Sequence, residues 1–187
     1  VPAEQLESLS GHYWSEEQRS VSKVAWSDGK LQVVVSDEQR FEMIPVAADR
    51  FAVQTPWFGV EVTFKETVDD KLQMSFLIDG AKEQRVYEKY VPREPSPQDL
   101  EAYAGTYFSD ELGVSYALDV DEGALVFRIV RHEAKTLTPL FGEIFSNSDY
   151  GTFEFKRGPD GAVGGFVLDA GRVRNLEFKR QNGDGCR

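Results

Sequence analysis

The sequence contains the same pattern twice, and this duplication constrains the fold more than any other feature. Residues 6–17 read LESLSGHYWSEE and residues 100–111 read LEAYAGTYFSDE, with identical residues at six of these twelve positions. The match continues at an offset of 94 and, after a three-residue slip, at an offset of 91: Gly29 with Gly123, Leu31 with Leu125, Pro45 with Pro139, Phe64 with Phe155 and Lys65 with Lys156. Two copies are too few for a solenoid, and each is long enough to bury its own small core. We therefore predict two homologous domains.

Almost all of each copy has the pattern of β-strands. Apolar and polar residues alternate in Val60–Lys65 and in Thr152–Lys156, as they do in half-buried strands. Gly and Asp in the intervening turns supply the positive φ angles that tight hairpins need. About eight short strands per copy suit a barrel, because closure removes sheet edges that one short helix could not cover. The predicted fold class is all-β: two tandem eight-stranded antiparallel β-barrels, each preceded by a short helix.

A proline-rich segment separates the two copies. Three prolines between Pro92 and Pro97 hold this segment extended and semi-rigid. A helix-start signal follows, with Ser96 as the N-cap, Pro97 at the first helical position and Asp99 two residues later. The predicted organisation is a first barrel at 1–91, a linker at 92–98, a second barrel at 99–181 and a polar tail at 182–187.

The composition argues against several kinds of partner. A net charge of −11 argues against nucleic acid and anionic membrane surfaces, because both are bound through clustered Lys and Arg. No apolar run approaches the roughly 20 residues of a membrane-spanning helix. Since the chain begins at Val1 without a signal peptide, we interpret it as a processed product or an excised fragment. The single cysteine, Cys186, allows no disulfide within the chain, and the composition fits cytosolic and exported proteins alike.

Two Ser-x-x-Lys sequences, Ser20/Lys23 and Ser27/Lys30, are the only suggestion of covalent catalysis. In penicillin-recognising hydrolases this spacing places both groups on one face of a helix, where the Lys activates the Ser. The first pair here lies in a predicted strand, whose alternation sends positions three apart to opposite faces, and the second spans a turn. We interpret both as chance matches and predict no catalytic residue.

No pattern indicates a metal or a cofactor. The two histidines, His12 and His132, do not occupy matching positions in the copies, and a zinc site needs three or four ligands at short spacing. Residues 119–123 read DVDEG, which resembles a calcium loop but lacks the later ligands. We interpret this segment as an acidic hairpin tip. The prediction is no metal site and no cofactor.

All three tryptophans lie in the first copy, and Trp57 is the most unusual of them. It follows Pro56 and precedes Phe58, in the segment where the first copy has three extra residues. Exposed aromatic residues on loops are often contact residues, so Pro56, Trp57 and Phe58 are the candidate binding residues. The alternative is that Trp57 and Phe58 fold back and close one end of the barrel.

The repeated motif Leu-Glu-x-x-x-Gly-x-Tyr, followed by a Gly turn, a Pro and a final aromatic-plus-basic strand, resembles a known accessory module. It is similar to the lipocalin-like β-barrel domains that follow the catalytic domain in serine hydrolases of the penicillin-binding-protein and class C β-lactamase type. The tandem arrangement resembles that of bacterial D-aminopeptidases. The resemblance implies that the barrels pack against a catalytic domain that is absent from this chain. In that family the catalytic domain carries the Ser-x-x-Lys nucleophile. It also implies that a barrel loop reaches the active-site mouth and restricts substrates.

The leading hypothesis is therefore a non-catalytic pair of barrels that docks on a serine-hydrolase domain, in the same parent chain or in trans, and shapes substrate access. The resemblance further implies a bacterial protein, with a homodimer formed through the parent as one option; the sequence leaves the compartment open between cytoplasm and periplasm or secretion. The alternative is a free-standing lipocalin-like binding protein for a small hydrophobic ligand. Eight-stranded barrels are just wide enough for one ligand or for their own side chains, and for copies this short we expect filled interiors.

Overall fold

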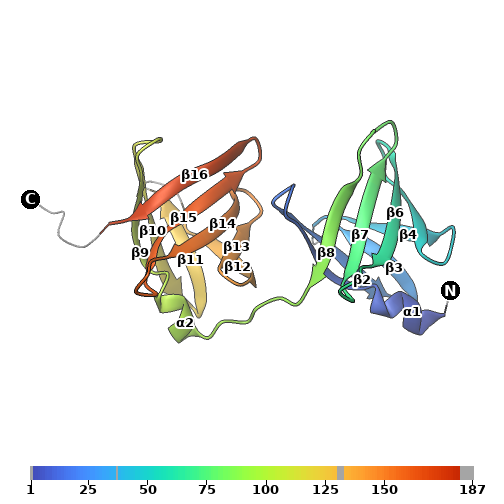
Figure 1. The fold of residues 1–187 in the computed structure, drawn as a ribbon, viewed down its shortest axis with the longest axis horizontal. Coiled ribbons are helices and arrows are strands. Elements are labelled where there is room, and N and C mark those ends of the chain that lie inside the picture. The colour runs from blue at the N-terminus through green and yellow to red at the C-terminus, as the bar shows by residue number, and fades with distance from the viewer. Residues whose placement is uncertain (1, 37, 130–132, 182–187) are drawn as a thin grey trace, which may run out of the picture. The chain divides into compact units, whose positions relative to one another are not determined.

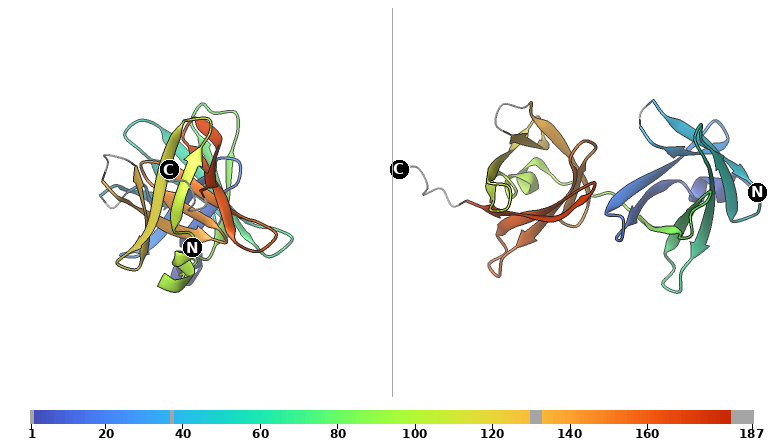
Figure 2. Two further views of the ribbon diagram at one scale, coloured as in Figure 1. Left: turned by 90° about the vertical axis from the view of Figure 1, so that its left-hand side faces the viewer. Right: turned by 90° about the horizontal axis from the view of Figure 1, so that it is seen from above.

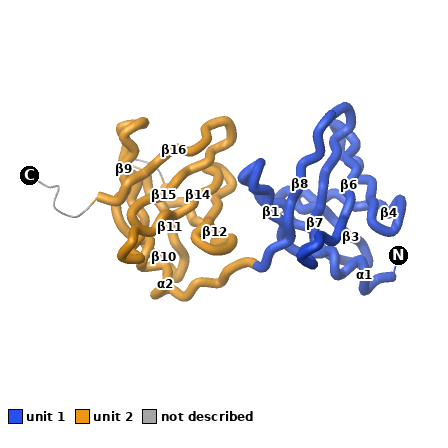
Figure 3. The backbone as a smooth tube through the Cα atoms, viewed as in Figure 1, with its two compact units in different colours: residues 1–91 blue, residues 92–187 orange. Residues whose placement is uncertain are grey.

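The computed structural model describes residues 2–36, 38–129 and 133–181. The chain forms two compact units, Val1–Val91 and Pro92–Arg187 (Figure 3). Each unit is a closed antiparallel barrel of eight strands (Figures 1 and 2), which confirms the predicted fold class. Within the described residues, no helix is both long and apolar enough to cross a membrane. The predicted tail, with Cys186, lies outside the described residues.

The first barrel is a simple up-and-down barrel in which every strand pairs with the next and β8 closes on β1. Its elements are α1 (Ala3–Ser8), β1 (Gly11–Ser15), β2 (Ser20–Ser27), β3 (Lys30–Val34), β4 (Arg40–Pro45), β5 (Arg50–Gln54), β6 (Gly59–Glu66), β7 (Leu72–Ile78) and β8 (Arg85–Tyr90). Alternate residues of these strands point inward, and Tyr13, Phe51, Val62 and Met74 are fully buried.

The second barrel repeats this topology, with β16 closing on β9. Its elements are α2 (Pro97–Glu101), β9 (Gly105–Ser109), β10 (Val114–Asp121), β11 (Ala124–Ile129), β12 (Lys135–Phe141), β13 (Ile144–Asn147), β14 (Gly151–Arg157), β15 (Val163–Ala170) and β16 (Val173–Arg180). The predicted helix start is confirmed: Ser96 Oγ accepts a hydrogen bond from the Asp99 amide at 3.2 Å, and the Ser96 amide donates to Asp99 Oδ2 at 3.0 Å.

Hairpin turns occupy equivalent places in both barrels. The β2–β3 turn has positive φ at Asp28 and Gly29, and the β10–β11 turn has positive φ at Glu122 and Gly123. Two consecutive positive φ angles match the twist of a two-residue hairpin, and Gly adopts them without steric cost. The DVDEG segment is therefore a hairpin tip, as the sequence predicts.

The segment 92–98 does not behave as one uniform linker. The Arg93 amide donates to the Leu140 carbonyl at 2.7 Å, which fastens the segment to β12 of the second barrel. Pro97 and Gln98 already belong to α2. The connection between the barrels is therefore the short stretch from the end of β8 at Tyr90 to Arg93, and residues 91–96 form no helix or strand.

Candidate functional site

A largely apolar pocket of about 460 Å³ opens at one end of the first barrel. Strands β2 to β8 contribute its walls, which include Val33, Phe41, Val53, Val60, Phe76 and Ile78. The pocket lies at the end where the β3–β4 and β5–β6 hairpins turn, because Gln39 and Thr55 also line it. Helix α1 lies at the other end of this barrel (Figure 1). The volume falls in the range of roughly 300–1,000 Å³ typical of small-molecule sites.

At four interior positions the first barrel has smaller side chains where the second has aromatic rings, and two of these, Ser22 and Val33, line the pocket. Strand register defines the equivalent positions, since Tyr13 pairs with Ser22 just as Tyr107 pairs with Tyr116. The replacements are Ser22 for Tyr116, Val33 for Phe127, Val62 for Phe153 and Met74 for Phe166. Each removes volume from the interior of the first barrel.

In the second barrel the same four aromatic residues pack against one another. Ring centroids lie 5.8 Å apart for Tyr116 and Phe127, 5.1 Å for Phe127 and Phe153, and 5.3 Å for Phe153 and Phe166. Phe178 stacks on Phe166 at 4.6 Å. The expected filled interior is thus found in the second barrel, whereas the first barrel keeps a pocket that the sequence analysis did not anticipate.

The Pro56–Trp57–Phe58 turn forms part of the pocket rim. Thr55 fixes it: its Oγ1 accepts hydrogen bonds from the amides of Trp57 (3.3 Å) and Phe58 (3.1 Å), and donates to the Phe58 carbonyl at 2.7 Å. Both aromatic residues line the pocket, yet 71% of Trp57 and 41% of Phe58 remain exposed. Pro56 is also exposed. The turn therefore holds two large aromatic side chains at the rim without closing the barrel.

The two Ser-x-x-Lys pairs do not form catalytic pairs. Ser20 Oγ lies 3.4 Å from the Tyr87 hydroxyl, whereas Lys23 is exposed. Ser27 donates to its neighbour Asp28, and Lys30 forms an ion pair with Glu42 at 2.8 Å. In neither pair does the structure show a hydrogen bond between the Ser hydroxyl and the Lys amine, because Ser20, Ser27 and Lys30 contact other residues.

The histidines and the acidic hairpin considered as possible metal ligands lie in different parts of the structure. His12 lies on β1, where burial and then the nearby Lys23 lower its pKa; His132 lies outside the described residues. Asp119 and Asp121 each contact Arg128 at 3.5 Å. Within 2–36, 38–129 and 133–181, no group of three or more His, Cys, Asp or Glu is arranged to hold a metal.

No family model matches this chain, and no curated protein matches it. The candidate site is therefore defined by its geometry alone. Sequence reasoning found the Trp57 turn but missed the pocket behind it. The available signal was the size difference between aligned residues such as Val33 and Phe127.

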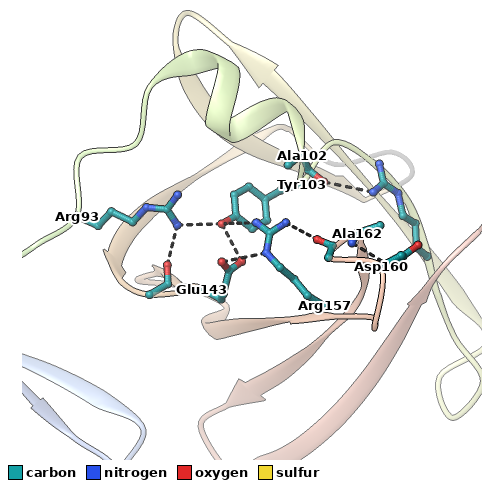
Figure 4. A network of polar contacts seen from close by, with 10 residues as sticks. Arg93, Ala102, Tyr103, Glu143, Arg157, Asp160 and Ala162 are labelled. Atoms are coloured by element: carbon teal, nitrogen blue, oxygen red, sulfur yellow. Dashed lines mark hydrogen bonds and ion pairs between the residues drawn. The ribbon is translucent and has the colours of Figure 1, made fainter.

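The second barrel contains a polar cluster centred on the buried Tyr103 (Figure 4). The Tyr103 hydroxyl accepts from Arg93 Nη1 at 2.9 Å and donates to Glu143 Oε2 at 2.8 Å. Arg157 Nε donates to Glu143 Oε1 at 3.1 Å, and its guanidinium lies 5.5 Å from the Tyr103 ring centre. The hydrogen bond to Glu143 raises the pKa of Arg157. Because Tyr103, Glu143 and both arginines satisfy one another, we interpret the cluster as structural.

Removal of the Tyr103 hydroxyl should destabilise the second barrel. Tyr103→Phe leaves Arg93 and Glu143 without one partner each, which we expect to cost about 1–3 kcal/mol in the free energy of unfolding, measured by urea titration. Tyr150→Phe is the matched control, since no hydrogen bond joins the Tyr150 hydroxyl to any other described residue. A loss for Tyr103→Phe no larger than for the control would contradict a stabilising role.

Proposed function

We propose that the chain is a non-catalytic pair of barrels that docks on the catalytic domain of a serine hydrolase and restricts substrate access through the Pro56–Trp57–Phe58 turn. The observation that supports this most is the exposure of Trp57 and Phe58 on a turn braced by Thr55. Trp is among the residues that contribute most to protein interfaces, and a pre-formed turn loses little entropy on binding. The motif resemblance supplies the class of partner.

The test of partnership starts from the source cells. The protein is isolated with an antibody against this chain and treated with a fluorophosphonate, which phosphonylates the oxygen of an activated serine with loss of fluoride. We expect label either on a polypeptide longer than this chain by roughly 300 residues or more, or on a separate chain that copurifies. A native protein of this length without a labelled partner would overturn the proposal.

The role of the turn is tested by a Trp57→Ala/Phe58→Ala double variant of the complete hydrolase. Loss of both rings should open the entrance and raise kcat/KM for bulky peptide substrates about tenfold relative to a small amide. Val68→Ala is the control, because Val68 is a fully exposed apolar residue on the β6–β7 turn. An unchanged ratio, or an equal change in the control, would contradict a gating role for the turn.

A second candidate function, binding of a small apolar ligand, is favoured by the 460 Å³ pocket of the first barrel. The neutral fluorophore 1-aminoanthracene should become brighter when it enters this pocket. Val33→Phe introduces the ring found at the equivalent Phe127 and should abolish that signal. Unchanged fluorescence on titration of the wild-type chain would rule out this function.

A further inference from the structure

We infer that the pocket of the first barrel selects an anionic amphiphile, with an apolar chain inside the barrel and an anionic head group at Arg85. This inference rests on the second candidate function, apolar-ligand binding. It adds the chemical class of the ligand and a residue that determines specificity.

Arg85 lies at the open end of the first barrel, where its side chain is exposed and lines the rim of the pocket. It is the first residue of β8 and pairs with Phe76, while Tyr87, two residues on, pairs with Met74. Met74 and Tyr87 are buried in the core. Since residues two apart in a strand share one face, Arg85 belongs to the same inner row and lines the pocket with Phe76.

The second barrel has a core residue at this position. There Leu176 pairs with Leu168 as Arg85 pairs with Phe76, and Leu176 is only 3% exposed. One copy therefore closes this position with an apolar side chain, whereas the other places a guanidinium at the edge of an apolar pocket. The same pocket is lined by Ser22 and Val33, which also replace larger residues of the second barrel.

The Arg85 guanidinium makes no ion pair or hydrogen bond with any other described residue. Arg50, Arg128 and Arg157 on other strands each contact a carboxylate. Glu17, Lys82 and Glu83 line the adjoining depression with Arg85, yet neither glutamate pairs with it. In a chain of net charge −11, this exposed cation at the pocket rim keeps its five donors available to a ligand.

The pocket and Arg85 together suit an amphiphilic ligand, whose apolar chain contacts the pocket walls and whose anionic head group contacts Arg85. The walls offer aliphatic and aromatic carbon, and the rim aromatic Trp57 extends this surface outward. A planar guanidinium binds a carboxylate through two parallel hydrogen bonds. An anionic head group satisfies Arg85 while its chain remains in the barrel.

The test is competition against bound 1-aminoanthracene with three ligands of equal chain length: decanoate, decanol and decyltrimethylammonium. For the wild-type chain we expect decanoate to bind about tenfold more tightly than decanol, and the cation to bind most weakly. Arg85→Gln should abolish the preference for decanoate while changing the affinity for decanol less than twofold. Arg40→Gln, a change at an exposed arginine of β4, should behave as the wild type.

The outcomes separate the inference from the function on which it rests. Equal affinities for decanoate and decanol, or an unchanged preference in Arg85→Gln, would overturn the role of Arg85 and leave apolar binding standing. Failure of decanol and the fluorophore to bind would overturn both. Val33→Phe should exclude all three ligands while its circular dichroism remains that of a folded barrel. Continued binding by this folded variant would place the ligand elsewhere and refute the inference.

Discussion

Phe166→Ala is expected to destabilise the second barrel by about 3–5 kcal/mol, a large fraction of the roughly 5–15 kcal/mol that holds a typical domain folded. Phe166 is 1% exposed and lies at the centre of the aromatic core. Its ring centroid is 4.6 Å from that of Phe178 and 5.1 Å from that of Tyr107. Strands from all sides of the barrel converge on this ring, so they cannot collapse to fill the cavity that its removal leaves.

The distribution of tryptophan makes this prediction specific to one barrel. All three tryptophans, Trp14, Trp26 and Trp57, belong to the first barrel. Tryptophan fluorescence during urea unfolding therefore follows the first barrel, whereas far-ultraviolet circular dichroism follows both. Each barrel has its own closed sheet and its own core, so we expect Phe166→Ala to lower the midpoint of the dichroism transition but not that of the fluorescence transition.

The control for this prediction is Val173→Ala. Val173 also lies in the second barrel, but it is 48% exposed, and its truncation should change stability by no more than about 0.5 kcal/mol. A parallel shift of both transitions in Phe166→Ala would contradict independent unfolding. A loss comparable to that of the control would show that the aromatic core relaxes around the missing ring.

The features that could be predicted from the sequence depend on local patterns. The duplication gives two domains, alternation gives strands, and turn residues such as Asp28–Gly29 fix the hairpins. The Ser96–Asp99 capping box is local as well. These signals require only neighbouring residues, so the closed eight-stranded barrels followed from them.

The features that were missed depend on register across strands. The four smaller side chains lie on four different strands, and no single pair such as Val33 and Phe127 reveals that they face one interior. The position of Arg85 at the pocket rim follows only from its pairing with Phe76. The Tyr103 cluster joins Arg93 and Glu143, which are far apart in sequence. Comparison of residue sizes between the copies, with register imposed, would have marked Ser22 and Val33 as smaller interior residues of the first barrel.

Gly151→Ala is expected to destabilise the second barrel by about 2–5 kcal/mol through two separate costs. Gly151 has φ +97°, a conformation that side chains other than glycine rarely adopt. A Cβ atom there would also lie 2.0 Å from the carbonyl oxygen of Asp169 on the paired strand β15. Because the clashing atom is backbone, no rotamer change relieves it, and β14 and β15 must separate. Far-ultraviolet circular dichroism in urea should show the loss, with tryptophan fluorescence of the first barrel as an internal reference.

Gly171→Ala separates the two costs within the same barrel. Gly171 also has positive φ, at +59°, but a Cβ atom there would meet nothing within 4 Å. Its substitution should therefore cost only the conformational strain of about 1–2 kcal/mol. The excess loss in Gly151→Ala then measures the close approach of β14 to the Asp169 carbonyl. Equal losses in the two variants would mean that the strands move apart at little cost, and that Gly151 is required for its backbone angle alone.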